Sequence, residues 1–163
     1  MSVSSTVFGY HVQYLYTLYR MIESADSKEV FVPEGREDLD IYLNDQIIET
    51  VQVKCYSGTI VYSDLFSKGK STSLFSRGKD SLAENSNVKI SFVAVGHGND
   101  KGVISDRLTK VSSLVKSLKK EETPHLDYAS SKELAAKILW QSKSQGELEN
   151  YVESVLKNRF PSI

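Results

Sequence analysis

The chain has little of what cross-links a protein or anchors it in a membrane. It contains one cysteine, Cys55, which excludes an internal disulfide. No run of about eighteen apolar residues occurs, and Met1–Ser5 has no basic segment leading into an apolar block. We therefore expect no membrane span, no signal peptide and a cytoplasmic location.

The length favours one domain. A chain of 163 residues can bury about 70% of its unfolded surface, which is enough for one independent core. No internal repeat or low-complexity segment divides the sequence. We expect residues 1–163 to form a single domain.

The charged residues are unevenly distributed along the chain, although the net charge is only −1. Residues 1–67 contain four basic and ten acidic side chains, whereas residues 68–120 contain eleven basic and four acidic ones. An acidic part followed by a basic part suits an enzyme that holds both a metal cation and a polyanion. The candidates for phosphate contacts are the basic residues Lys68, Lys70, Arg77, Lys79, Lys89 and Lys110.

An amphipathic helix is expected near the start of the chain. Apolar residues recur there at intervals of three and four, and a serine or threonine at positions 4–6 can cap the helix. The apolar stripe consists of Phe8, Val12, Leu15, Tyr19 and Ile22. A separate facet contains Tyr10, Gln13, Thr17 and Arg20. This facet is either the solvent-facing side of the helix or part of a site.

The next two runs predict a β-hairpin with one polar face. Apolar and polar side chains alternate in residues 38–43 and again in residues 47–55. Side chains two positions apart lie on the same face of a strand. The side chains on the predicted polar face include Asp38, Asp40, Gln52 and Lys54.

The register of this hairpin depends on its turn. A turn centred on Gln46 would place Asp40 opposite Gln52. The same register would place Asp38 opposite Lys54. Carboxylates can hold a hard divalent cation beside a lysine that faces a phosphate, which is the minimal equipment for phosphodiester hydrolysis. The alternative is a solvent-facing hairpin with an ordinary cross-strand ion pair.

The later chain is expected to supply scaffold. A strand over residues 88–95 ends at Gly96-His97-Gly98, where a strand-exit turn is expected and a phosphate cradle is the alternative. The other two histidines, His11 and His125, have no partners at metal-ligand spacing.

Three further helices are predicted in the second half of the chain. One covers residues 108–118, one begins at Ser130 with a capping box, and one begins at Glu147. The helix that begins at Ser130 would bury Leu134, Ile138 and Leu139.

The ordered motifs resemble a nuclease family. Gln52-Val53-Lys54 resembles the third motif of the QxK branch of the restriction-endonuclease-like PD-(D/E)xK superfamily. Together with Gly9–Tyr14 and Glu34–Asp40, it is similar to the Mrr-like, CD-NTase-associated endonuclease domain of bacterial anti-phage effectors. That domain acts on double-stranded DNA.

The resemblance implies roles for individual residues. Asp40 would be the principal metal ligand, and Lys54 would be the catalytic lysine. Gln52 would be a neutral ligand at a position where most of the superfamily has an acid. The metal would be Mg²⁺, with Mn²⁺ as a substitute.

Two further residues gain roles from the same resemblance. Glu34, at the end of a strand predicted over residues 28–34, would be an additional ligand or a base. Gln13 would orient the metal site or contact DNA. Asp38 could equally be a charge at the rim, so the roles of Asp38 and Asp40 stay open.

The resemblance also implies the fold and the partners. We expect an α/β fold with a restriction-endonuclease-like central mixed sheet flanked by helices. The domain would be the N-terminal effector part of a larger defence protein, forming homo-oligomers under the control of a sensor or ATPase region. The alternatives are a nuclease acting on RNA or branched DNA, and a catalytically silent interaction module.

Overall fold

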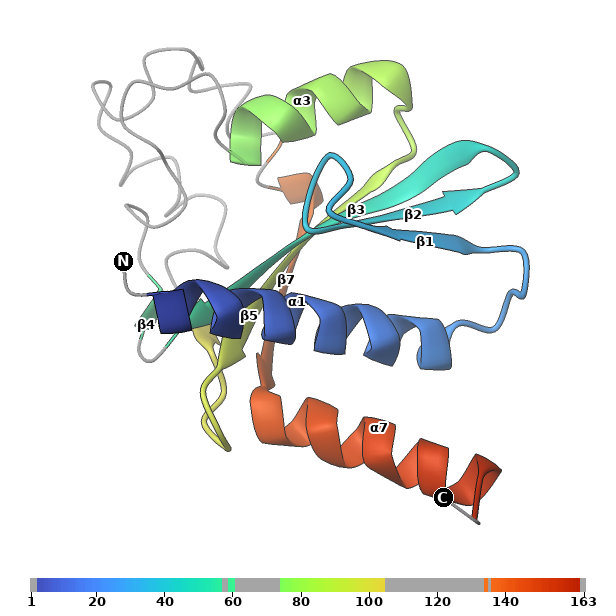
Figure 1. Ribbon diagram of the computed structural model, residues 1–163. Coiled ribbons are helices and arrows are strands. Elements are labelled where there is room, and N and C mark those ends of the chain that lie inside the picture. The colour runs from blue at the N-terminus through green and yellow to red at the C-terminus, as the bar shows by residue number, and fades with distance from the viewer. Residues whose placement is uncertain (1–2, 57–58, 61–73, 105–133, 135, 162–163) are drawn as a thin grey trace.

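A five-stranded mixed sheet in the order β1-β2-β3-β5-β7 forms the centre of the fold (Figure 1). Its strands are β1 (Val30–Pro33), β2 (Leu39–Leu43), β3 (Gln46–Tyr56), β5 (Lys89–Gly96) and β7 (Ile138–Ser144). The pairs β1–β2 and β2–β3 are antiparallel, whereas β3–β5 and β5–β7 are parallel. The computed structural model describes residues 3–56, 59–60, 74–104, 134 and 136–161. A separate parallel pair joins β4 (Thr59–Ile60) to β6 (Val103–Ile104).

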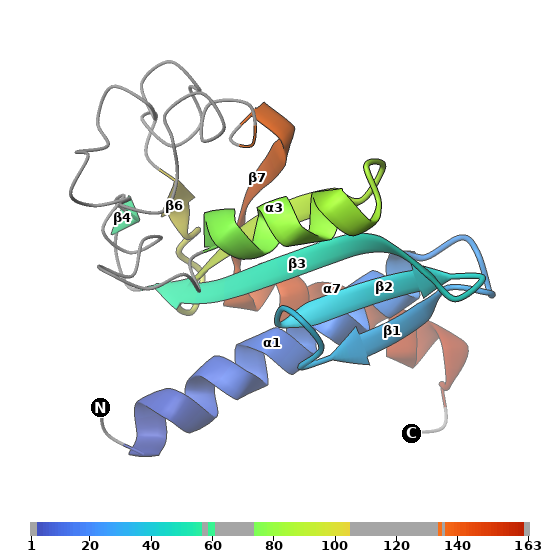
Figure 2. The same cartoon turned by 90° about the horizontal axis from the view of Figure 1, so that it is seen from above.

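Helices cover both faces of the sheet (Figure 2). α1 (Val3–Glu23) and α7 (Gln145–Arg159) lie on one face, and α3 (Leu74–Glu84) lies on the other. The core beneath α1 and α7 consists of Val12, Tyr16, Leu39, Ile41, Val51, Val53, Val93, Val95 and Leu148. This arrangement confirms the predicted α/β class with a mixed sheet flanked by helices.

Most of the predicted helices and strands that lie within the described residues are confirmed. The first helix is α1, the strand expected over residues 28–34 is β1, and the strand expected over residues 88–95 is β5. The last helix, α7, begins two residues before the predicted start. Ser144 caps it, and Glu147 completes a capping box.

The predicted hairpin register is wrong by two residues. The turn consists of Asn44 and Asp45, both with positive φ (51° and 62°), rather than being centred on Gln46. A bulge then shifts the pairing by one residue, so that Asp40 lies opposite Thr50. A shift of two residues preserves the predicted faces, because side chains alternate with a period of two.

The element predicted around Ile138 and Leu139 is also wrong. Residues 138–144 form β7, parallel to β5, rather than a continued helix. Trp140 of β7 lies beside Phe92 of β5, with ring centroids 5.5 Å apart. Short apolar runs fit a helix or a strand equally well, and pairing with β5 decided between them.

Some predictions fall outside the described residues. They concern the helix over residues 108–118 and the capping box at Ser130. The phosphate-contact candidates outside the described residues are Lys68, Lys70 and Lys110.

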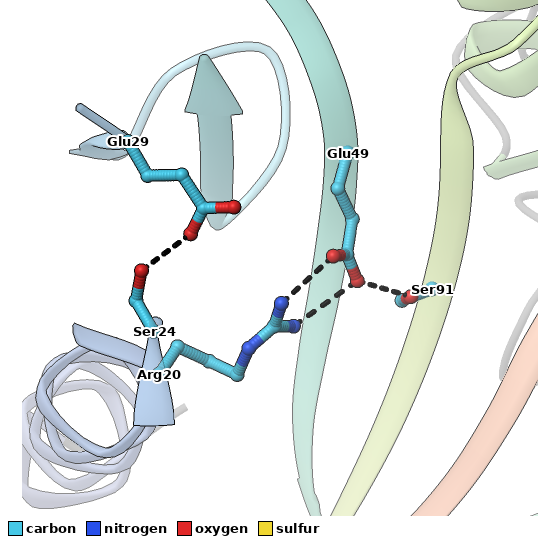
Figure 3. Close-up of polar contacts among 5 residues, drawn as sticks. All are labelled: Arg20, Ser24, Glu29, Glu49 and Ser91. Carbon is cyan, nitrogen blue, oxygen red and sulfur yellow. Dashed lines mark hydrogen bonds and ion pairs between the residues drawn. The ribbon is translucent and has the colours of Figure 1, made fainter. Parts of the chain in front are cut away.

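An ion pair ties α1 to the sheet (Figure 3). Arg20 donates two hydrogen bonds to the carboxylate of Glu49 on β3, at 2.8 and 3.1 Å. Ser91 on β5 donates a third to the same carboxylate, at 2.6 Å. Arg20, expected on a polar facet of the helix, therefore helps to fix α1 across β3 and β5.

Candidate active site

The candidate site lies where β2 begins, beside the longer β3. β2 begins at Leu39, opposite Val51, so the end of β3 continues beyond its antiparallel partner. Asp38 stands just before β2, and its Oδ2 accepts a hydrogen bond from the backbone N–H of Val53 at 2.7 Å. If the β2–β3 register is extended by one residue, Asp38 lies level with Gln52. The site is therefore built at the divergence of two strands.

Two more predicted residues converge on Asp38. The side chain of Gln13, from α1, lies within reach of the Asp38 carboxylate, and Lys54 lies near enough to attract it electrostatically. Burial raises the pKa of Asp38, although the Val53 N–H, Lys54 and Gln13 all act to lower it. The structure thus brings together an acid, an amide and a lysine that the sequence had separated by up to 41 positions.

A pocket of about 450 Å³ opens beside these residues. Its lining residues are Phe8, Gly9, Gln13, Val53, Lys54, Cys55, Tyr56 and His97. The Oε1 atom of Gln13 is buried and has no hydrogen-bond partner among the described residues. Since buried polar atoms are normally paired, this oxygen is available to a ligand.

Asp40 lies in a different environment from Asp38. Its side chain is fully buried, and Oδ2 accepts a hydrogen bond from the backbone N–H of Arg36 at 2.7 Å. Burial raises the pKa of Asp40, although the backbone N–H groups of Arg36 and Glu37 act to lower it. A Cβ atom at Gly35 would lie 2.4 Å from Oδ2, so the close approach of the loop requires glycine there. Asp40 thus holds the loop before β2 through Oδ2, whereas its Oδ1 is buried and has no hydrogen-bond partner among the described residues. Asp38 contacts the residues around Lys54.

The other two acids before β2, Glu34 and Glu37, differ in burial. Glu34 is exposed, has a φ of 54°, and donates its backbone N–H to the Asp38 carbonyl at 3.1 Å. Glu37, which the sequence did not single out, is buried and forms an ion pair with Arg77. Burial raises the pKa of Glu37 despite this partner. Arg77, expected to contact DNA, therefore neutralises a buried acid beside the site.

Two candidate lysines on the described surface can be placed. Lys79 is exposed on α3, and Lys89 is exposed at the start of β5. Lys89 pairs in register with Glu49, at the opposite end of β5 from Gly96. It therefore lies away from the pocket at the end of β3.

The donor chemistry suits a hard cation. Asp38, Gln52 and Gln13 offer carboxylate and amide oxygens, the ligand type that Mg²⁺ prefers. Among the described residues, no three His, Cys, Asp or Glu side chains are grouped closely enough to hold a metal ion. The residues therefore fit a cation held by one carboxylate and by amides, with water and substrate phosphate completing the coordination.

The fold and the site define a class of protein. A mixed sheet with an acid, an amide and a lysine at the divergence of two strands is consistent with a restriction-endonuclease-like fold. The family model described as "Cap4, dsDNA endonuclease domain" matches residues 4–159, and the chain belongs to that family. No curated protein and no solved structure matches the chain.

Family membership identifies the chain as a double-stranded DNA endonuclease domain. None of the described helices has the length and apolar character needed to cross a membrane.

Proposed function

We propose that this domain is a Mg²⁺-dependent endonuclease that hydrolyses phosphodiester bonds of double-stranded DNA in the pocket beside Lys54. The observation that supports this most directly is the position of Asp38. Its carboxylate accepts a hydrogen bond from the Val53 N–H, and both Gln13 and Lys54 lie near enough to favour its charged form. A phosphate bound there would meet a cationic side chain and a metal ligand at once.

Each residue has a distinct part in this proposal. Lys54 contacts the scissile phosphate and stabilises the negative charge that builds up on it. Asp38 and Gln52 supply oxygen ligands, and the free Oε1 of Gln13 supplies another or orients a water molecule. Bound Mg²⁺ would polarise the phosphate and lower the pKa of a coordinated water.

We propose that Asp38, rather than Asp40, is the principal metal ligand. Asp40 holds its own loop through Oδ2 and keeps only Oδ1 unpaired, whereas Asp38 lies close to Gln13, Val53 and Lys54. Glu34, which is exposed, would act from the rim as a base or through water.

The main experiment is plasmid cleavage by the parent and Lys54→Ala, with Mg²⁺ and with chelator. Loss of one preorganised electrostatic stabiliser should slow cleavage by about 10² to 10³. Circular dichroism would confirm that the variant folds. Lys28→Ala removes an exposed lysine between α1 and β1 and serves as the control. Undiminished cleavage by folded Lys54→Ala would overturn the assignment, and RNA or branched DNA can be offered in the same assay.

We also propose that the domain is the effector part of an anti-phage defence protein and acts when copies associate under a sensor or ATPase region. A nuclease indifferent to sequence needs such control, and two sites on one duplex can cut both strands. The surface proposed for association is an exposed apolar stripe on α1.

The outer stripe of α1 is apolar although it faces away from the sheet. Its residues are Val7, Tyr10, Tyr14, Leu18 and Met21, with exposed fractions between 37% and 61%. Their spacing of three and four residues matches the seam between two packed helices. None of these side chains is charged, so two copies could bring the same stripe together without like-charge repulsion.

The area of the outer stripe suits conditional pairing. It presents on the order of 450 Å² per copy, since each half-exposed tyrosine contributes about 100 Å². Two copies would bury roughly 900 Å², below the 1,200–2,000 Å² or so of stable interfaces. We therefore propose a second copy as the occupant, bound weakly until copies are clustered.

A further inference from the structure

We propose that His97 binds a phosphate of the DNA strand next to the one that Lys54 contacts, and so helps to position the substrate. This inference rests on the proposed function of the pocket, and it adds a residue to it. The sequence interpretation gave His97 only as part of a strand-exit turn, with a phosphate cradle as the alternative.

The sheet brings His97 to the pocket. β3 and β5 run parallel with Lys54 level with Ala94 and Tyr56 level with Gly96. His97 follows directly and donates its backbone N–H to the Tyr56 carbonyl at 3.2 Å. This places the side chain on the lining of the same pocket as Lys54.

The turn that carries His97 is held on several sides. The backbone N–H of Asp100 donates to the His97 carbonyl at 3.1 Å, and Gly146 donates to the Gly98 carbonyl at 2.7 Å. A Cβ atom at Gly96 would lie 2.1 Å from the Asp100 carbonyl oxygen, so the turn closes only around glycine. Gly98 adopts a φ of +59°, which also favours glycine. His97 is therefore presented by a tightly connected turn.

A ring contact restricts the imidazole as well. The Phe8 ring of α1 meets it edge to face, with centroids 4.9 Å apart and an interplanar angle of 63°. Phe8 lines the same pocket. A side chain held in this way loses little further entropy when it binds a ligand.

The lining of the pocket offers donors to an anion. Its lining includes Lys54 and His97 but no carboxylate. An imidazole N–H can donate to a phosphate oxygen. His97 comes three residues after Ala94, which is level with Lys54, so the backbones of Lys54 and His97 are offset by about 10 Å along the strands. That separation suits two phosphates on one DNA strand better than a single shared one, and phosphate contacts of this kind fix the register of DNA on a protein.

The test separates hydrogen bonding from packing. His97→Phe keeps a ring against Phe8 and removes the N–H donor, while His97→Gln restores a donor. His11→Ala is the control, because His11 is exposed and lies beside Glu149 at 3.6 Å. We expect His97→Phe to raise the KM for duplex DNA about five- to tenfold, with kcat within about twofold, and His97→Gln to recover part of the loss.

Direct binding provides a second measurement. Fluorescence anisotropy with a short labelled duplex should show the same weakening for His97→Phe, even if no cleavage occurs. Absence of cleavage by the parent would contradict the proposed function, whereas the binding data would still decide the role of His97. A folded His97→Phe that keeps the parent's KM and affinity, or a His11→Ala that loses as much, would overturn this inference.

Discussion

At the scale of single residues, two aspartates two positions apart have different environments. The Asp38 carboxylate accepts from Val53 on the neighbouring strand, and the Asp40 carboxylate accepts from Arg36 in its own loop. Both carboxyls have a pKa raised by burial, so the pKa direction does not distinguish them. Their hydrogen-bond partners do.

Neutral replacements should separate these two roles. Asp38→Asn removes the charge beside Lys54 and should weaken Mn²⁺ binding by at least about tenfold, because ligand charge sets affinity for hard cations. Asp40→Asn keeps an oxygen that can accept from the Arg36 N–H, so it should retain Mn²⁺ affinity within about threefold. Calorimetric titration of the three proteins measures this. Loss of Mn²⁺ binding in Asp40→Asn alone would restore Asp40 as the principal ligand.

At the scale of elements, the attachment of α1 matters most, because α1 carries Gln13 to the site. The Arg20–Glu49 pair joins this helix to β3, and Glu49 is only 5% exposed. Burial alone would raise the pKa of Glu49, but the hydrogen bonds from Arg20 and Ser91 and the charge of Arg20 hold it below its usual value.

Breaking this pair should destabilise the fold in a pH-dependent way. Glu49→Gln leaves the Arg20 charge without its partner and should lower the free energy of unfolding at pH 7 by about 3 kcal/mol. The lowered pKa means that the stabilisation is present above the unfolded value of about 4.3 and is lost as pH falls through the folded-state pKa. The gap between variant and parent should therefore narrow below about pH 4.

Urea unfolding at several pH values measures this gap. Ser24→Ala, at the end of α1 and outside the Arg20–Glu49 pair, is a suitable control. A constant gap from pH 7 to pH 3 would mean that packing, and not the charge of Glu49, accounts for the loss.

At the scale of the whole molecule, cleavage should depend on the association of copies. Dilute protein should mainly nick plasmid DNA, and protein clustered by a tetrameric tag should make double-strand breaks. Introducing glutamate at both Tyr14 and Leu18 should suppress this gain, because like charges would then meet across the paired stripes. Val30→Glu, on exposed β1, is the matched control.

Sedimentation beside the plasmid assay distinguishes the outcomes. Full double-strand cutting by a verified monomer would contradict control by association. If the variant with glutamate at Tyr14 and Leu18 behaves like the parent when clustered, the stripe does not pair two copies. A regulatory region would then be the partner that binds the stripe.

The sequence by itself determined the local elements and the chemistry that they carry. Period-two alternation predicted a polar face with Asp38, Asp40, Gln52 and Lys54, and period-three-and-four spacing predicted α1. These signals are local, because each residue's neighbours along the chain decide its face. Family membership could likewise be anticipated from the order of a few short motifs.

Only the tertiary structure decided which of these residues meet. The two-residue turn and the bulge set the β2–β3 register, which places Asp40 opposite Thr50 and Asp38 one step further along β3. The β3–β5 pairing brings His97 to the pocket of Lys54. Parallel pairing with β5 made residues 138–144 a strand where helix was predicted. Register and parallel pairing depend on contacts between residues far apart in the chain, and local periodicity contains no information about these contacts.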